Sequence, residues 1–296
     1  MSGRSGFVSI IGRPNVGKST LLNHLVGHKI AIISDKPQTT RNRIQGVYTT
    51  SRGQAIFIDT PGIHKPKHKL GEYMVKVAQR CLKEVDLILY VVDASSRFGP
   101  GEQYILDNLQ GIKTPVFLVV NKIDLISKKD LMVYIADYQQ RREFAEVIPV
   151  SALTGENLGR LEELVFQYLP EGPQFYPADV VTDQPEKFVM AELIREKVLL
   201  LTREEVPHSI AVDIEEIKPR NDNLIYVRAI IYTERESQKG ILIGRNGKML
   251  KDIGQLSRQD IENLLGTQVF LELWVKVKKD WRNREAYLRA FGFNRE

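Results

Sequence analysis

The sequence has very little cysteine and no long apolar run. A single cysteine, Cys81, occurs among 296 residues, which excludes a disulfide within the chain and is typical of a reducing compartment. The N-terminus has no apolar signal core, and no apolar run approaches the length needed to span a bilayer. We therefore expect a cytoplasmic protein in which Cys81 is a small buried residue.

Charge is unevenly distributed along the chain, whose net charge is +5. Residues 171–238 carry 8 Lys and Arg against 14 Asp and Glu, whereas residues 239–296 carry 12 against 7. An acidic block beside a basic one predicts a polyanion-binding face in the last part of the chain. The length predicts two domains, since 296 residues is long for one core.

A glycine-rich stretch follows the apolar run of residues 7–11 and precedes a helical pattern over 20–25. Its spacing is G-x-x-x-x-G-K-S, which directs backbone N–H groups and a helix N-terminus at one polyphosphate. Lys18 would reach the terminal phosphates and Ser19 would bind magnesium. The predicted phosphate-binding residues are Gly12, Arg13, Pro14, Asn15, Val16, Gly17, Lys18 and Ser19.

β-Branched apolar runs alternate with helical patterns through the first half of the chain. The runs are residues 8–11, 56–58, 87–92, 116–120 and 147–150. This alternation predicts an α/β domain with a mostly parallel sheet and helices on both faces. Residues 45–50 and 54–59 flank a polar turn and predict an antiparallel hairpin at one sheet edge. Ligands of such sheets bind at the carboxyl ends of the strands.

Three further motifs fall at such strand ends. Asp59-Thr60-Pro61-Gly62 provides a carboxylate that can hold magnesium through water and a glycine whose N–H can approach a terminal phosphate. Asn121-Lys122-Ile123-Asp124 ends in a carboxylate that can accept two hydrogen bonds from guanine but not from adenine. Ser151-Ala152-Leu153 would add a backbone N–H to the base carbonyl.

In this order the motifs resemble those of translation-factor-related GTPases. The resemblance implies that a threonine of Gln38-Thr39-Thr40-Arg41 closes onto magnesium when GTP is bound. We assign that role to Thr40, with Thr39 as the alternative. The basic segment 64–69 is either a nucleotide-sensitive partner contact or a solvated loop.

The residue after D-x-x-G departs from the Ras-like pattern. Ras-like proteins place a water-orienting glutamine there, whereas this chain has Ile63, which can neither donate nor accept a hydrogen bond. We therefore expect no catalytic side-chain base. The motif resembles a subgroup in which backbone and switch groups position the water. Some members hold potassium through an asparagine that matches Asn15; the alternative for Asn15 is stabilisation of the loop.

Several prolines with polar neighbours follow Leu169 and mark a domain boundary. We expect a GTPase domain over residues 1–170, a linker over 171–185, a second domain over 186–279 and a basic C-terminal tail over 280–296. Helical and strand patterns in the second domain follow the order α-β-β-α-α-β, with G-x-x-G between two helices.

That arrangement resembles a KH domain of the second (type II) topology, in which G-x-x-G lets a nucleic-acid backbone approach. The resemblance implies that Gly244, Arg245, Asn246, Gly247, Lys248 and Lys251 face the backbone, and that Ile241 and Ile243 form the floor of the cleft under the bases. The alternative is a helix–helix turn capped by glycines. Lys276, Lys278, Lys279, Trp281 and Arg282 interleave basic residues with an aromatic, which predicts phosphate pairing and stacking on a base.

Both domains together resemble the Era family of bacterial ribosome-assembly GTPases, including the closing strand over 271–278. The resemblance implies slow GTP hydrolysis with Mg²⁺, and a KH domain that binds single-stranded RNA near the 3′ end of the small-subunit rRNA and assists assembly of the 30S-type subunit. Peripheral contact with the cytoplasmic face of the membrane is also a property of the family, although nothing in this sequence requires it. We expect a monomer. The alternatives are a constitutive RNA-binding adaptor with a structural nucleotide, and a tRNA-modifying GTPase. The latter needs a cysteine or cofactor site in the second domain, whereas Cys81 lies in the first.

Overall fold

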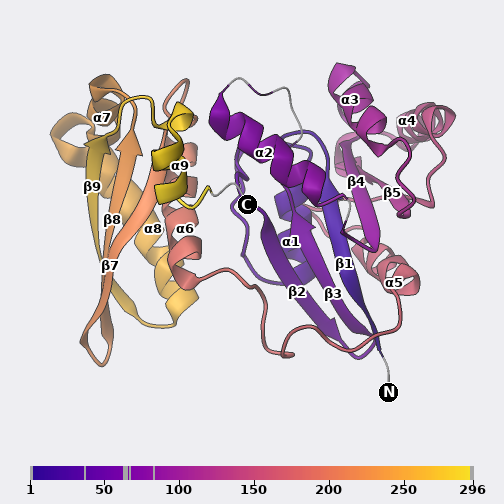
Figure 1. Cartoon of the computed structure of the whole chain (residues 1–296), viewed down its shortest axis with the longest axis horizontal. Helices are drawn as coiled ribbons and strands as arrows, with labels where there is room; N and C mark the ends of the chain where they lie inside the picture. The colour runs from indigo at the N-terminus through magenta and orange to yellow at the C-terminus, as the bar shows by residue number, and fades with distance from the viewer. Residues whose placement is uncertain (1–2, 37, 63–65, 67, 83, 294–296) are drawn as a thin grey trace. The chain divides into compact units, whose positions relative to one another are not determined.

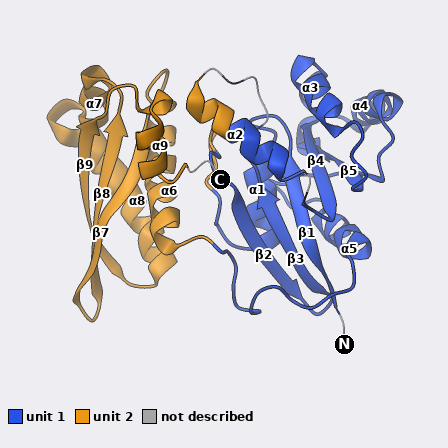
Figure 2. Cartoon of the chain, in the orientation of Figure 1, with its two compact units in different colours: residues 1–31, 40–66, 74–183 blue, residues 32–39, 67–73, 184–296 orange. Residues whose placement is uncertain are grey.

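The computed structural model describes residues 3–36, 38–62, 66, 68–82 and 84–293. The chain forms two compact units (Figure 2). The first comprises Met1–Ala31, Thr40–Pro66 and Met74–Asp183, and the second comprises Ile32–Thr39, Lys67–Tyr73 and Gln184–Glu296. The prediction for Ile63, and those for positions 64, 65 and 67 of the basic segment, concern positions outside the described residues. No helix in the described part of the chain is both long and apolar enough to cross a membrane.

A six-stranded sheet forms the centre of the first unit (Figure 1). Its order is β2-β3-β1-β4-β5-β6, and all neighbouring strands are parallel except β2 and β3. The strands are β1 (Arg4–Ile11), β2 (Ile44–Thr50), β3 (Gly53–Asp59), β4 (Leu87–Asp93), β5 (Val116–Asn121) and β6 (Glu146–Pro149). The predicted parallel sheet and its antiparallel edge hairpin are therefore confirmed.

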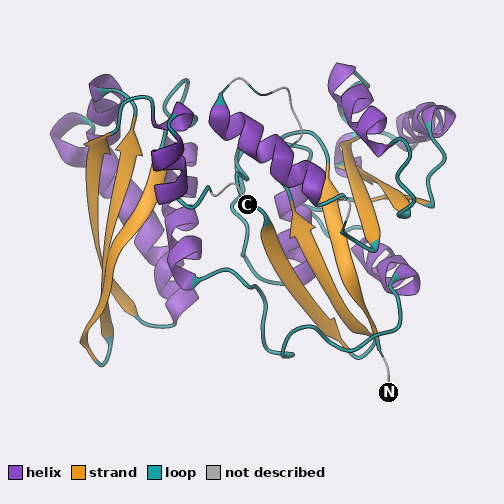
Figure 3. Cartoon of the chain, viewed as in Figure 1, coloured by secondary structure: helices purple, strands orange, loops and turns teal. Residues whose placement is uncertain are grey.

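Helices cover this sheet because its strands are apolar on both faces. They are α1 (Lys18–Val26), α2 (Lys69–Arg80), α3 (Pro100–Leu109), α4 (Lys128–Arg141) and α5 (Leu158–Tyr168), with the short 3₁₀ turn η1 (Ile123–Leu125). Alternate β4 residues, among them Ile88 and Tyr90, pack with Ala78, Leu106 and Tyr138 of α2, α3 and α4. Of the other helices, α1 contacts β1, β2 and β3, and α5 contacts β1 and β3 (Figures 1 and 3).

The predicted linker contains no helix, as expected, but it lies on the first unit. The Val47 N–H of edge strand β2 donates to the Val181 carbonyl at 2.9 Å, and the Tyr176 N–H donates to Gln54 Oε1 at 2.9 Å. The segment therefore protects the edge strand instead of extending into solvent. The first unit extends to Asp183, beyond the predicted end at residue 170.

The second unit contains the order α-β-β-α-α-β that was predicted. Its elements are α6 (Glu186–Leu201), β7 (Ala211–Asn221), β8 (Leu224–Thr233), α7 (Glu236–Ile243), η2 (Arg245–Gly247), α8 (Lys248–Leu265), β9 (Gln268–Val277), η3 (Trp281–Asn283) and α9 (Glu285–Ala290). In the sheet β7-β8-β9, β8 is antiparallel to β7 and parallel to β9. Val227 and Ile231 of β8 share an apolar core with Ile194 of α6 and Ile253 of α8.

The C-terminal segment is folded, in contrast to the predicted tail. Trp281 is fully buried, its Nε1–H donates to the Ser209 carbonyl at 2.8 Å, and its ring centroid lies 5.3 Å from that of Phe291. The predicted stacking of Trp281 on a nucleic-acid base is therefore wrong, because the ring is inaccessible. The guanidinium of Arg282 pairs with the Glu234 carboxylate at 2.5 Å, so this predicted phosphate contact is already engaged within the unit.

Candidate nucleotide site and nucleic-acid cleft

The loop between β1 and α1 has the geometry of a phosphate-binding loop. Gly17 adopts φ 97° at the N-cap of α1, and a Cβ there would lie 2.2 Å from Asn121 Nδ2, so a side chain is excluded. The Lys18 ammonium is buried and donates to the Gly12 and Arg13 carbonyls at 3.2 and 2.7 Å. Burial lowers the pKa of Lys18 to about 8, although the Asp59 carboxylate acts in the opposite direction. A cation is thus held where the loop would surround a polyphosphate.

Three oxygen-bearing side chains meet beside this loop. Ser19 Oγ and Thr40 Oγ1 donate to Asp59 Oδ2 at 2.7 and 3.1 Å, and the two hydroxyl oxygens lie 3.0 Å apart. Thr39 does not join them, because its hydroxyl donates to the Lys36 carbonyl at 2.6 Å. Of the two threonines proposed from the sequence, the structure brings Thr40 to the candidate metal site.

The chemistry of this cluster fits a magnesium ion. Its donors are all oxygen, as magnesium prefers, and they come from three separate elements. Asp59 Oδ1 is buried and has no hydrogen-bond partner among the described residues. Burial raises the pKa of Asp59 above its ordinary value, although Lys18 and the two hydroxyls oppose this effect. A cation would therefore satisfy a buried carboxylate that is otherwise unfavourable in its charged form.

Asn121, at the end of β5, joins the loops of the predicted guanine site. Its Nδ2 donates to the Val16 carbonyl at 2.8 Å, and its Oδ1 accepts the Ala152 N–H at 2.9 Å. Ser151 is fully buried, whereas Leu153 is 78% exposed. Asp124 lies in η1 with an exposed side chain, as access to a base requires. The structure therefore brings the N-K-x-D and S-A-L motifs to the phosphate loop.

The D-x-x-G motif also lies against the phosphate loop. A Cβ on Gly62 would lie 2.7 Å from the Pro14 backbone nitrogen, so the close approach requires glycine. Thr60 is buried and its hydroxyl donates to the Ile10 carbonyl at 2.9 Å. Asn15 is exposed and has φ 67°, a left-handed conformation that asparagine tolerates better than most residues.

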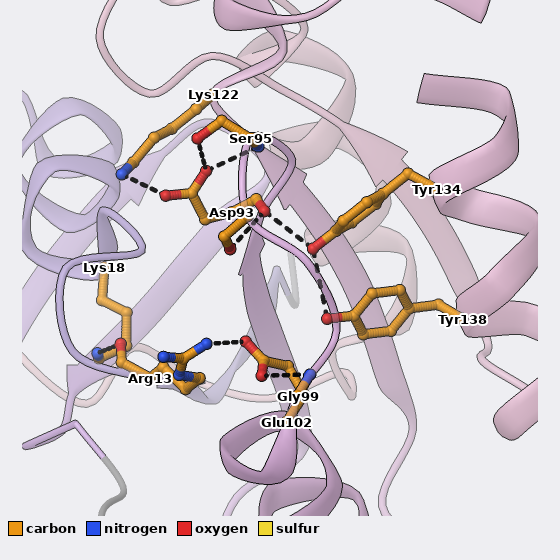
Figure 4. A network of polar contacts seen from close by, with 10 residues as sticks. Arg13, Lys18, Asp93, Ser95, Gly99, Glu102, Lys122, Tyr134 and Tyr138 are labelled. Carbon is orange, nitrogen blue, oxygen red and sulfur yellow. Dashed lines mark hydrogen bonds and ion pairs between the residues drawn. The ribbon is translucent and has the colours of Figure 1, made fainter. Parts of the chain in front are cut away.

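Two carboxylates that sequence reasoning missed hold parts of this site (Figure 4). Glu102 accepts from Arg13 Nη1 at 2.7 Å, so Arg13 contributes its backbone to the loop while its side chain is directed to α3. Asp93 accepts from the Lys122 ammonium at 2.6 Å. A carboxylate at the end of the apolar strand β4 was the signal available for Asp93, whereas nothing in the sequence pairs Glu102 with Arg13.

The G-x-x-G turn of the second unit depends on an unusual backbone. Gly244 adopts φ 72° and ψ 177°, and a Cβ there would lie 2.7 Å from that of Met249. Such a conformation is essentially confined to glycine. Arg245, Asn246 and Lys248 project from this turn as exposed side chains. Nothing in the described part of the chain forms an ion pair with Arg245, Lys248 or Lys251. The turn therefore presents cations to solvent.

A cleft of about 490 Å³ begins at this turn and runs between α8 and β9. Its lining residues are Gly247, Leu250, Lys251, Gly254, Gln255, Arg258, Val269, Phe270, Leu271 and Leu273. Ile241 and Ile243 are not among them, so the predicted floor is wrong. Ile241 is 51% exposed on α7, and Ile243 packs against the core of the unit. Alternate apolar residues of β9 form the floor instead.

The basic residues at the end of β9 and directly after it do not line the cleft. Lys276 lies 3.6 Å from Glu215 of β7, on the sheet face opposite to Leu271 and Leu273 because strand side chains alternate. The Lys278 ammonium lies 4.5 Å from the centroid of the Tyr232 ring. Lys279 is exposed beyond the strand. None of these three lysines lines the cleft.

A short segment before Thr40 belongs to the second unit (Figure 2). Within that unit, the Ile33 N–H donates to Glu196 Oε1 at 2.9 Å, and Arg195 donates to the Thr39 carbonyl. Arg195 and Glu196 are consecutive buried residues of α6. The residue adjoining the candidate metal ligand is therefore held by a helix of the second unit.

Two family models match the chain. A model described as a 50S ribosome-binding GTPase matches residues 7–122, and a KH domain model matches residues 205–282. The chain is similar to the GTPase Era of Heliobacterium modesticaldum, with 63% identity over 98% of this chain and 97% of the relative. It is also similar to the GTPase Era of Carboxydothermus hydrogenoformans, with 58% identity over 99% of each.

Solved structures agree over nearly the whole chain. Aquifex aeolicus Era bound to GDP·AlF4⁻ superposes with a TM-score of 0.95 at 45% identity, covering 99% of this chain and 100% of that one. Era in complex with MgGDPNP and nucleotides 1506–1542 of 16S ribosomal RNA superposes with a TM-score of 0.96 at 46% identity, with the same coverage. The P-loop GTPase fold followed by a KH domain is thereby confirmed.

Proposed function

We propose that this chain, which belongs to the Era family of GTPases, uses GTP binding to control how its KH cleft holds single-stranded RNA of the small ribosomal subunit. The chain hydrolyses GTP, as its family does. The proposal that GTP controls RNA binding rests on the position of the segment before Thr40. Residues 32–39 pack within the second unit, while Thr40 itself hydrogen-bonds with the candidate magnesium ligands of the first.

In the nucleotide site, phosphate oxygens would replace the Gly12 and Arg13 carbonyls as acceptors for Lys18. Ser19 and Thr40 would hold Mg²⁺ directly and Asp59 through water. The ion supplies positive charge to the terminal phosphates. Asp124 would accept the two guanine donors, while Asn121 holds the phosphate loop and the S-A-L loop together. With Ile63 after the glycine, we propose that backbone and switch groups position the attacking water.

We propose that Asn15 helps to hold a potassium ion that supplies further charge during hydrolysis. Its exposed side chain and its place in the phosphate loop support the proposal. The left-handed backbone at Asn15 equally suits a residue that only stabilises the loop. Turnover should rise when potassium replaces sodium at the same ionic strength. Equal rates in the two salts would leave Asn15 with the structural role.

In the cleft, unpaired bases would lie on Leu250, Leu271 and Leu273, while Arg245 and Lys248 contact phosphates at the entrance. The relative solved with 16S nucleotides 1506–1542 supports the choice of RNA near the 3′ end of the small-subunit rRNA. From that choice we propose a role in assembly of the 30S-type subunit.

The test measures affinity for that RNA segment with a non-hydrolysable GTP analogue and with GDP. We expect tighter binding with the analogue, and a smaller difference in Arg195→Ala, which loses the donor to the Thr39 carbonyl. Arg203→Ala changes an exposed residue just after α6 and serves as the matched control. Equal affinity in the two nucleotide states would instead indicate a constitutive RNA-binding adaptor.

A further inference from the structure

Asp93, the last residue of β4, uses both carboxylate oxygens in separate contacts (Figure 4). Its Oδ1 accepts from the Ser95 N–H at 2.9 Å and from the Ser95 hydroxyl at 2.6 Å. Its Oδ2 accepts from the Lys122 ammonium at 2.6 Å. The Asp93 side chain is 14% exposed and that of Lys122 is 31% exposed. The pair is therefore partly shielded from water and its geometry is fixed from the Asp93 side.

The backbone of Asp93 is also anchored. Its carbonyl accepts from the Tyr134 hydroxyl at 2.9 Å and from the Ser96 hydroxyl at 3.0 Å. The next residue, Ala94, donates its N–H to the Asn121 carbonyl at 2.9 Å. Burial favours the neutral acid, but hydrogen bonds from Lys122 and Ser95 outweigh it and hold the pKa of Asp93 below its ordinary value. Asp93 is thus a charged partner for Lys122 that several hydrogen bonds hold in place.

Lys122 needs such a partner because its backbone is unusual. It adopts φ 65° at the N-cap of η1, a left-handed conformation that is unfavourable for lysine. Asp124 follows two residues later within η1. The orientation of the Asp124 carboxylate therefore depends on keeping Lys122 in this turn. A strained residue persists only where its surroundings hold it.

We propose that Asp93 is a positioning residue for guanine specificity: by holding the Lys122 ammonium it fixes the turn from which Asp124 binds the base. The inference rests on the proposed guanine-binding role of Asp124 and adds a residue outside the N-K-x-D motif. Asp93 itself makes no contact with the base in this scheme. Its effect should be confined to the contact that Asp124 makes.

The test compares GDP with inosine diphosphate (IDP), which lacks the exocyclic amine and so makes one fewer contact with Asp124. In Asp93→Asn we expect GDP affinity to fall about tenfold, the size of one lost charge-assisted hydrogen bond. IDP affinity should fall less, so that the GDP to IDP preference decreases several-fold. The dissociation constants of GDP and IDP are both measured on one preparation by competition titration. A partly unfolded fraction of the variant therefore changes both by the same factor and leaves their ratio unchanged.

Glu102→Gln is the matched control, because Glu102 holds the phosphate loop through Arg13 and not the base. It should alter GDP and IDP affinity by the same factor. An unchanged ratio in Asp93→Asn would overturn the inference and assign Asp93 a purely structural role. If the wild-type protein itself did not distinguish GDP from IDP, the guanine-binding role of Asp124 would fail instead. The proposed control of RNA binding by GTP is tested by the separate RNA-affinity experiment and does not depend on either result.

Discussion

In the first unit, the groups expected to bind phosphate, metal and base already hydrogen-bond with one another, and most are buried. Lys18, Asp59 and Asn121 are all less than 10% exposed. In the second unit, the cations beside the cleft are exposed and the floor is apolar. The nucleotide site is thus a preorganised polar network, whereas the cleft is a shaped surface. A substitution in the network leaves a buried partner unsatisfied, while one at the cleft removes only a solvated contact.

The largest effect should come from Asn121→Ala. The substitution leaves the Val16 carbonyl and the Ala152 N–H without their partner, and two such losses cost about 3 kcal/mol, or more than a hundredfold in affinity. Titration calorimetry with GDP measures the loss. Asn108→Ala, which removes two hydrogen bonds outside the nucleotide site, one within α3 and one to Gln79 of α2, is the control. A less than tenfold loss would mean that the loops are held together mainly by other contacts.

The next effect should be a pH dependence of nucleotide affinity. Lys18 must be protonated to bind phosphate, and burial lowers its pKa to about 8 in the free protein. Phosphate raises that pKa in the complex, so binding takes up a proton. The affinity for GDP is therefore constant below about pH 8 and falls by up to about tenfold per pH unit above it. Measuring the GDP dissociation constant from pH 7 to 9.5 tests this. A flat profile would show that Lys18 stays charged throughout.

The smallest effects should come from the cleft. Lys248→Ala removes one exposed cation, so RNA affinity should fall by about fivefold, with a shallower dependence on salt. Lys276→Ala is the matched control, because that lysine pairs with Glu215 away from the cleft lining. Filter binding at several salt concentrations measures both. Equal losses in the two variants would contradict the assigned cleft, because Lys276 lies on the opposite face of the sheet.

Much of the nucleotide site could be predicted from the sequence because its motifs are local. Gly12 to Ser19 specify a turn and a helix start within eight residues. The sequence favoured Thr40 but left Thr39 as the alternative, since adjacent residues of one loop differ only in which hydroxyl is directed at Asp59. Glu102 was missed because its partner Arg13 lies 89 residues away in the chain.

The errors in the second unit have a different origin. Basic residues interleaved with an aromatic predict a stacking surface, but the same pattern also suits a C-terminal segment that packs its aromatic residue inside the domain. Trp281 is packed in this way because Phe291 and Phe293, which follow it in the chain, contact its ring. Ile241 and Ile243 were placed in the cleft because they precede the G-x-x-G turn. The alternation of β9, which places Leu271 and Leu273 there, was the better indicator.

The linker over residues 171–185, which hydrogen-bonds to β2, has a consequence for how the two units are coupled. Only Gln184 and Pro185 separate Asp183, where the first unit ends, from the first residue of α6. A tether this short gives groups on α6 a high effective concentration toward the rest of the chain. Residues 32–39 of the second unit also run directly into Thr40 of the first, so the two units are joined through the backbone at the candidate metal site as well as at Asp183.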